Sequence, residues 1–117
     1  MTPKRGDRVA PPAGAGDWEL RFATSEAAKG WEGLCQQATA NTAAVWHELR
    51  ARRDHPVPTS RHHQLKGRLG TAAHRGVDME QWQYEVTSGG RIWYLVDSDN
   101  HTLWLRHAGT GHPKDTE

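Results

Sequence analysis

A chain of 117 residues with a formal net charge of +1 and 35% hydrophobic residues fits one domain with a small core, to which six tryptophans contribute much of the apolar area. Its single cysteine, Cys35, excludes an internal disulfide framework. No apolar run approaches the roughly 20 residues that span a bilayer, and the N-terminus has no apolar signal-peptide region, so we expect a cytoplasmic protein without a membrane partner.

The N-terminal stretch is rich in Pro, Gly and Ala and shows neither a helical nor a strand period. We therefore expect a flexible, extended or disordered arm over residues 1–16 and a single folded domain over residues 17–117. The domain opens with Trp18, Leu20 and Phe22, which alternate with polar residues and predict a first strand.

Two helices are predicted next. Thr24 or Ser25 suits the N-cap of the first helix, and Asn41 suits the N-cap of the second. Apolar residues then recur at helical spacing, as Ala27, Trp31, Leu34, Cys35 and Ala38 in the first helix and as Val45, Trp46 and Leu49 in the second. The first helix also contains Gly30 and Gly33, which either weaken it or let its backbone approach a sheet closely.

A basic region follows the helices. The segment 63–69 predicts a short strand with Lys66 and Arg68 on one face, and the segment 70–78, which contains His74 and Arg75, predicts a loop. No carboxylate occurs from residue 55 to residue 77. Such a block is either a solvated basic surface or the electrostatic footprint of a polyanion.

Three strands are predicted over residues 82–87, 91–97 and 101–107, which are rich in β-branched and aromatic residues. Turn residues separate them, so neighbouring strands are antiparallel. In the middle strand, alternation places Arg91, Trp93 and Leu95 on one face. The predicted fold is α+β with the order β-α-α-β-β-β-β, a small, mainly antiparallel sheet with both helices on one face.

Several phrases resemble the RelE/ParE superfamily of bacterial toxins. They are Leu65-Lys66-Gly67-Arg68-Leu69, the strand Arg91-Ile92-Trp93-Tyr94-Leu95-Val96 and the closing Gly111-His112-Pro113-Lys114. The likeness runs from Trp18 onward, and the Leu-Lys-Gly phrase before a hairpin is most similar to the YoeB branch. The resemblance implies a RelE-like fold.

The resemblance also implies an activity and partners. It points to the toxin of a type II toxin–antitoxin system, an endoribonuclease that cuts messenger RNA in the ribosomal A site and is silenced by a cognate antitoxin. Cleavage in this group needs no metal or cofactor, because the ribose 2′-OH attacks the adjacent phosphate. Such chemistry needs a base, an acid, and cations around the transition state. A homodimer and a hetero-oligomer with the antitoxin are both open.

The resemblance implies catalytic roles for residues at positions that match the family. Arg91 occupies the position of the phosphate-stabilising arginine. His63 falls where the YoeB branch carries a glutamate base, and is either a base or a solvated loop histidine. Glu85 lies near the position of a lysine in the RelE branch, and is either a base or the polar side of a strand.

The C-terminus departs from the family pattern. His112 matches a Gly-His-Arg phrase and is the candidate acid, with His107 and His74 as alternatives. Pro113 replaces the usual arginine, no tyrosine follows, and Lys114 is the nearest replacement charge. The candidate RNA and phosphate contacts are Lys66, Arg68, Arg75, Lys114 and Trp93.

Two other functions stay open. A ParE-like protein inhibits DNA gyrase without nuclease chemistry, and a degenerate toxin only binds its antitoxin. A metal site is not predicted, because the eight histidines match no familiar ligand spacing.

Overall fold

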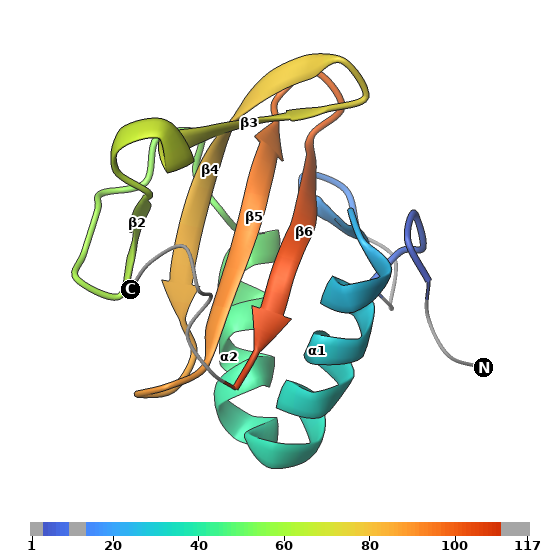
Figure 1. The fold of residues 1–117 in the computed structure, drawn as a ribbon, viewed down its shortest axis with the longest axis vertical. Helices are drawn as coiled ribbons and strands as arrows, with labels where there is room; N and C mark the ends of the chain where they lie inside the picture. The colour runs from blue at the N-terminus through green and yellow to red at the C-terminus, as the bar shows by residue number, and fades with distance from the viewer. Residues whose placement is uncertain (1–3, 10–13, 111–117) are drawn as a thin grey trace.

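The structure, a computed structural model, describes residues 4–9 and 14–110 and has an α+β architecture (Figure 1). Its elements are β1 (Glu19–Phe22), α1 (Ser25–Gln37), α2 (Thr39–Arg50), β2 (His62–Gln64), the 3-10 helix η1 (Gly67–Gly70), β3 (Thr71–His74), β4 (Val77–Glu85), β5 (Arg91–Asp97) and β6 (Thr102–Gly109). None of the helices in the described part of the chain has the length and apolarity that a bilayer crossing requires.

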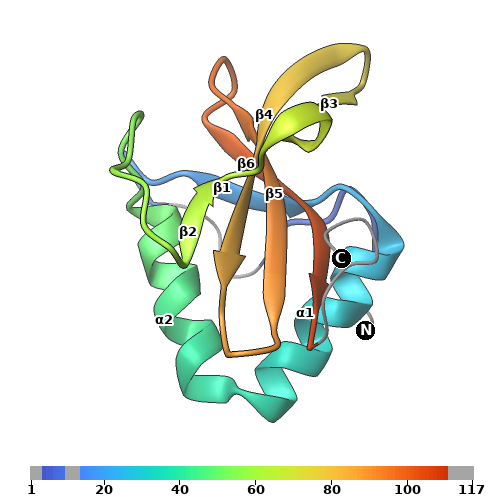
Figure 2. The ribbon, with the colours of Figure 1, turned by 60° about the vertical axis from the view of Figure 1, so that its left-hand side comes forward.

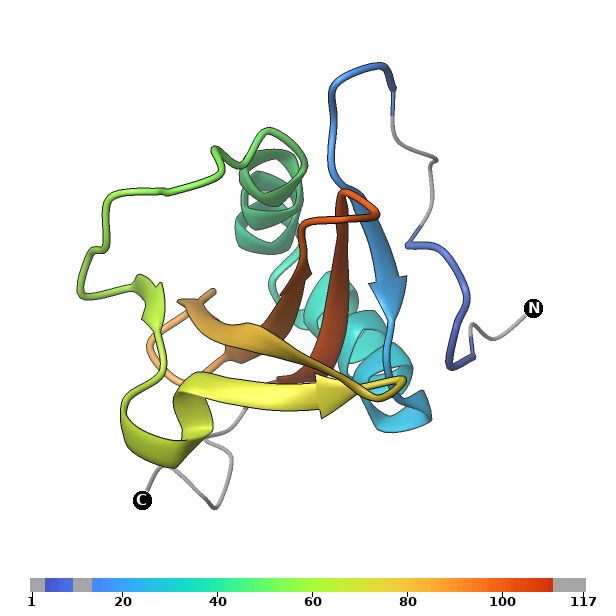
Figure 3. The same ribbon diagram turned by 90° about the horizontal axis from the view of Figure 1, so that it is seen from above.

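The strands form one six-stranded sheet in the order β1-β6-β5-β4-β2, and β3 also pairs with β4. β1 runs parallel to β6, whereas the other strand pairs of the described chain are antiparallel. Both α-helices cover the same side of the sheet, as Figures 2 and 3 show. We call this side the helix face and the opposite side the open face.

The main core lies between the helices and the sheet. Thr24 caps α1, because its side chain accepts a hydrogen bond from the Ala27 amide at 2.9 Å. The apolar stripe of α1 then buries Ala27, Trp31 and Leu34 against the helix face. The sheet contributes the buried residues Leu20, Phe22, Trp82, Ile92, Tyr94, Leu103 and Leu105. The apolar residues that recur with a period of 3.6 in the helix and of 2 in the strands therefore pack in one core, as the sequence predicts.

Gly30 is the residue that lets α1 approach the sheet. A Cβ atom at Gly30 would lie 1.6 Å from the carbonyl oxygen of Ala108 in β6. A Cβ atom at Gly33 would meet nothing within 4 Å. Of the two readings of these glycines, close backbone approach therefore applies to Gly30.

The predicted N-cap of the second helix is wrong. α2 begins at Thr39 with Ala38 as its N-cap residue and no side-chain capping bond. Because one residue alone separates the two helices, there is no room for a capping turn at Asn41. The Asn41 side chain instead donates to the carbonyl of Val86 at 3.3 Å, which ties α2 to the end of β4.

The strand predicted over 63–69 is too long, and the loop predicted over 70–78 is wrong. β2 ends at Gln64, and Gly67, with a φ of +62°, turns the chain into η1. β3 then runs back into β4 through Arg75 and Gly76, whose φ angles are 54° and 80°. Two consecutive residues with positive φ make a tight hairpin turn. Arginine is not a usual turn signal, so the sequence does not indicate a hairpin at this position. The predicted order therefore lacks one strand, β3.

The β3–β4 hairpin folds over one end of the open face, as Figure 1 shows. A second, smaller core lies beneath it, in which Met79, Leu95, Trp104 and Ala23 are buried and Ala72 is partly buried. The rest of the open face, toward the β4–β5 turn, is covered by neither α-helix.

Part of the N-terminal arm lies along the free edge of β1. The Gly6 amide donates to the Phe22 carbonyl at 2.6 Å, and the Val9 amide donates to the Leu20 carbonyl at 2.7 Å. Val9 is itself buried. Residues 4–9 contain a turn at Arg5 and Gly6, and they cover an edge that would otherwise expose unpaired backbone groups.

Candidate functional site

Strand register arranges the polar side chains of the open face in rows. One row crosses four strands through His63, Gln83, Trp93 and His107, each directly opposite the next. The neighbouring row places Glu85 of β4 opposite Arg91 of β5. Side chains opposite one another on one face have Cβ atoms about 5 Å apart. Consequently the open face brings a cation, a carboxylate and imidazoles together.

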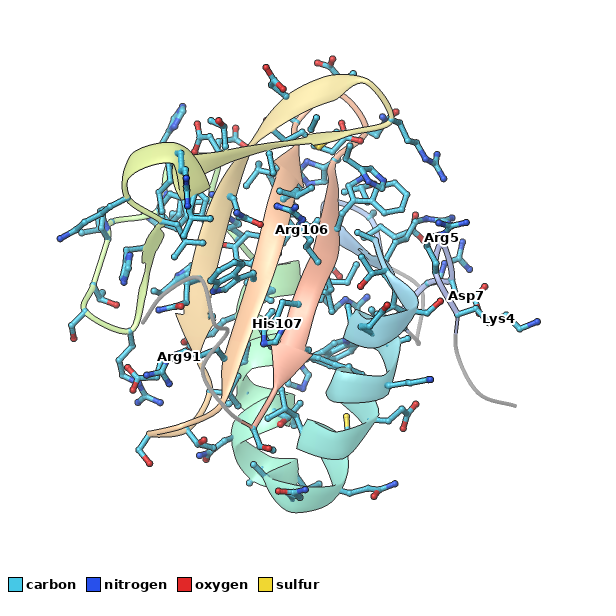
Figure 4. The ribbon with its side chains drawn as sticks, viewed as in Figure 1. Lys4, Arg5, Asp7, Arg91, Arg106 and His107 are labelled. Carbon is cyan, nitrogen blue, oxygen red and sulfur yellow. The ribbon has the colours of Figure 1, made fainter. Side chains whose placement is uncertain are left out.

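A bulge in β6 adds a second cation. The register shifts between Trp93 and Tyr94, so that Trp93 faces His107 while Tyr94 faces Leu105. The extra residue is Arg106, and it shares the open face with His107, as Figure 4 shows. Bulges re-aim side chains in this way next to functional sites.

Arg106 is the accessible cation of this face. It is exposed, and its Nη1 donates to the Oε1 of Gln81 at 3.0 Å. Gln81 is fully buried, and its Nε2 donates to the Leu69 carbonyl at 2.8 Å. A satisfied buried amide therefore fixes the direction of the Arg106 side chain across the sheet.

His107 has the chemistry of a proton acceptor. Its ring lies 5.9 Å from the Trp93 ring, and within the described chain its buried Nε2 has no hydrogen-bond partner. Burial lowers the pKa of His107, because desolvation disfavours the imidazolium. The imidazole is consequently neutral at pH 7, which a general base requires.

Arg91, the predicted phosphate-stabilising arginine, is buried and does not face solvent. It is 8% exposed, and its Nη1 donates to the carbonyls of Thr87, Ser88 and Gly90 at 3.1 to 3.2 Å. The same nitrogen lies 3.4 Å from the Glu85 carboxylate. Arg91 therefore braces the β4–β5 turn and also places a positive charge beneath one end of the open face.

His63 and Glu85 lie toward the β4 edge of the sheet. The Nδ1 of His63 lies 3.0 Å from the Gln64 carbonyl, and the ring is partly buried. Three strand spacings separate His63 from His107, which puts their Cα atoms about 14 Å apart. The two histidines are thus too far apart to act together on one phosphate, and Glu85 is engaged with Arg91.

The predicted RNA contacts are spread over the molecule. Lys66 and Arg68 are exposed, at the start of η1 beyond β4, and not on a strand beside Arg91. Trp93 is 6% exposed and donates from its indole nitrogen to Gln83 at 2.9 Å, so its ring is mostly core. Arg75 sits at the β3–β4 turn. His112 and Lys114 lie outside the described residues.

The helix face holds a separate polar cluster that the sequence did not indicate. Arg52 is 7% exposed and donates from Nε to the Tyr94 hydroxyl at 3.1 Å, and the His62 Nε2 lies 2.5 Å from the same hydroxyl. Burial, followed by the nearby Arg52 charge, lowers the pKa of His62 to about 4. Burial raises the pKa of Tyr94. These groups lie inside the core and not on the open face.

Sequence reasoning missed Arg106 and Gln81. The signal present was the pair Arg106-His107 near the end of a strand, but simple alternation puts consecutive residues on opposite faces. A bulge overrides that rule and is not visible in the sequence. Among the described residues, no group of three or more His, Cys, Asp or Glu side chains is arranged to hold a metal ion.

Comparisons with protein-family models, with curated proteins and with solved structures found no match to this chain.

Proposed function

We propose that this protein is a toxin of the RelE/ParE superfamily and cleaves messenger RNA on the ribosome. The observation that carries the proposal is the open face, on which Arg106 and His107 are neighbours and the partly covered charge of Arg91 lies toward the β4–β5 turn. Two helices on the other face of a mainly antiparallel sheet support a RelE-like fold. The proposed partners are a cognate antitoxin, the ribosome and mRNA, in the cytoplasm.

In the proposed reaction the neutral His107 takes the proton of a ribose 2′-OH. The 2′ oxygen then attacks the adjacent phosphorus, the bond to the 5′ oxygen breaks, and a 2′,3′-cyclic phosphate forms. Arg106 stabilises the charge that gathers on the phosphate oxygens, and Arg91 adds positive charge farther along the open face, toward the β4–β5 turn. Protonation of the leaving 5′ oxygen is assigned to His112, the residue for which the resemblance implies that role.

The test is cleavage of a defined mRNA by the purified full chain, with and without ribosomes. We expect cuts only with ribosomes, and 5′ fragments that end in a cyclic phosphate. The matched substrate carries a 2′-O-methyl group at the mapped cleavage nucleotide. Cleavage of this methylated RNA would contradict the mechanism, because it lacks the attacking hydroxyl.

A second candidate function is gyrase inhibition without nuclease chemistry. The observation that favours it is the engagement of Arg91 with three hairpin carbonyls, which gives this residue a structural role independent of any phosphate. A DNA supercoiling assay beside a translation assay separates the two candidates. If expression affects neither process nor growth, the chain is a degenerate toxin that only binds its antitoxin.

A further inference from the structure

A cationic hollow lies at the turn of the β3–β4 hairpin. It has a volume of about 290 Å³. Its lining residues are Arg5 of the N-terminal segment, Phe22 at the end of β1, His74 at the end of β3, Arg75 in the turn and Trp104 of β6. Figure 4 shows Arg5 on the N-terminal segment, on the β1 side of Arg106. Elements far apart in the sequence thus build one pocket.

The two arginines of this pocket form no ion pair with any described residue. Arg5 is exposed, and no hydrogen bond or ion pair joins its side chain to another described residue. The Arg75 guanidinium lies 4.8 Å from the centre of the Trp104 ring and makes no ion pair within the described chain. Two like charges around one hollow repel each other, and an anion between them removes that repulsion.

Two carboxylates near the pocket, Asp97 and Asp7, already accept hydrogen bonds. Asp97 accepts hydrogen bonds from the Trp104 indole nitrogen at 3.2 Å and from the Asn100 side chain at 2.9 Å. Asp7 accepts a hydrogen bond from the Lys4 amide at 2.9 Å. These donors are neutral, so Asp97 keeps its charge and acts on the nearby His74 through space. Among the described residues, no carboxylate forms an ion pair with Arg5 or Arg75.

His74 supplies an unused polar group. Its ring lies 4.4 Å from the Trp104 ring, and its Nε2 is buried without a hydrogen-bond partner among the described residues. Buried polar atoms without partners are rare in native proteins and call for an explanation. An oxygen of a bound anion, accepting a hydrogen bond from this nitrogen, provides one.

The turn of the hairpin holds a cation, Arg75, in a strained backbone conformation. Arg75 has a φ of 54°, a left-handed conformation that glycine, asparagine or aspartate adopts at less cost. Strain of this kind concentrates at ligand-binding sites. The guanidinium of Arg75 lies over the Trp104 ring at the pocket.

We infer that the pocket of Arg5, His74 and Arg75 binds a phosphate group of single-stranded RNA. Trp104 is three residues before His107 on β6, a separation of about 10 Å along a strand, so one RNA strand reaches both the pocket and the open face. The choice of RNA as the ligand rests on the proposed function, because a free phosphate ion has the same chemistry.

The experiment measures binding of a short, fluorescein-labelled 2′-O-methyl RNA to the full chain by anisotropy, at several salt concentrations. The double variant Arg5→Ala/Arg75→Gly removes both cations, and glycine suits the left-handed turn. We expect at least a tenfold loss of affinity and a salt slope smaller by about 0.7, because the pocket neutralises one phosphate and each phosphate neutralised on a single strand contributes about 0.7. The control Lys29→Ala removes an exposed charge from α1 and should change affinity less than twofold.

Unchanged binding by the double variant, or no binding by the native chain, overturns the inference. Inorganic phosphate that shifts the His74 NMR signals, while the RNA does not, shows a free-anion site and also overturns it. Ribosome-dependent cleavage is measured separately. If cleavage is absent while RNA affinity still depends on Arg5 and Arg75, the pocket stands and the proposed nuclease activity falls.

Discussion

Arg106 and His107 are consecutive residues of β6 that share the open face. They do so because Arg106 is the extra residue of a bulge, between Leu105, which pairs with Tyr94, and His107, which pairs with Trp93. Arg106 reaches Gln81 two strands away, and His107 lies against the Trp93 ring. A cation and a neutral imidazole are thus held side by side on a rigid strand. This arrangement is the structural basis of the proposed catalysis.

The first prediction concerns His107. His107→Gln removes the proton acceptor while keeping a polar side chain of similar size. We expect ribosome-dependent cleavage to fall at least 100-fold, within the usual contribution of general base catalysis. Thermal unfolding should shift by a few degrees at most. The control is His55→Gln, an exposed histidine of the loop after α2; cleavage by His107→Gln within threefold of the native rate would refute the assignment.

The second prediction concerns Arg91. Its guanidinium donates to three turn carbonyls in a buried setting, so Arg91→Ala should lower the free energy of unfolding by about 2–3 kcal/mol. Urea denaturation measures this change, with the exposed Arg53→Ala as control. If stability is unchanged while cleavage is lost, Arg91 acts mainly on the substrate and the bracing role is wrong.

The third prediction compares two glycines of one helix. Gly30→Ala forces a methyl group into the Ala108 carbonyl and should destabilise the fold by about 3 kcal/mol or more. Gly33→Ala meets no neighbour and should stabilise it by about 0.5–1 kcal/mol. Both values come from chemical denaturation. Equal effects at the two positions would show that α1 does not approach β6 as closely as described.

The fourth prediction concerns pH. The folded-state pKa of His62, about 4, is below its ordinary value near 6.5, so the unfolded chain binds the proton more readily. The contribution of His62 is therefore complete above pH 6.5, declines as the pH falls from 6.5 to 4, and is absent below that window. Allowing for its partial exposure, we expect a loss of about 2 kcal/mol.

Denaturation midpoints at pH 7, 5.5 and 4.5 measure the decline. The comparison variant, His62→Gln, cannot titrate and should lose less stability over the same window. Burial lowers the pKa of His74 and His107 in the same direction, so the variant keeps part of the slope. A slope identical to that of the native chain would mean that His62 is not buried neutral beside Arg52 and Tyr94.

Local patterns in the sequence determined much of this fold. Aromatic and β-branched residues between turn signals located β5 at residues 91–97, and alternation assigned Arg91, Trp93 and Leu95 to one face. A capping residue and an apolar stripe of helical spacing located α1, with Thr24 at its start. These features follow from the backbone periods of strands and helices, which neighbouring residues alone set.

Tertiary structure decided the rest. β3 forms because it pairs with β4 through a turn that forces Arg75 into a left-handed conformation, and no local signal favours arginine there. The bulge that brings Arg106 beside His107 depends on the pairing of β6 with β5. The close contact at Gly30 depends on a helix meeting a strand far along the chain. Each depends on contacts distant in sequence, which periodicity cannot encode.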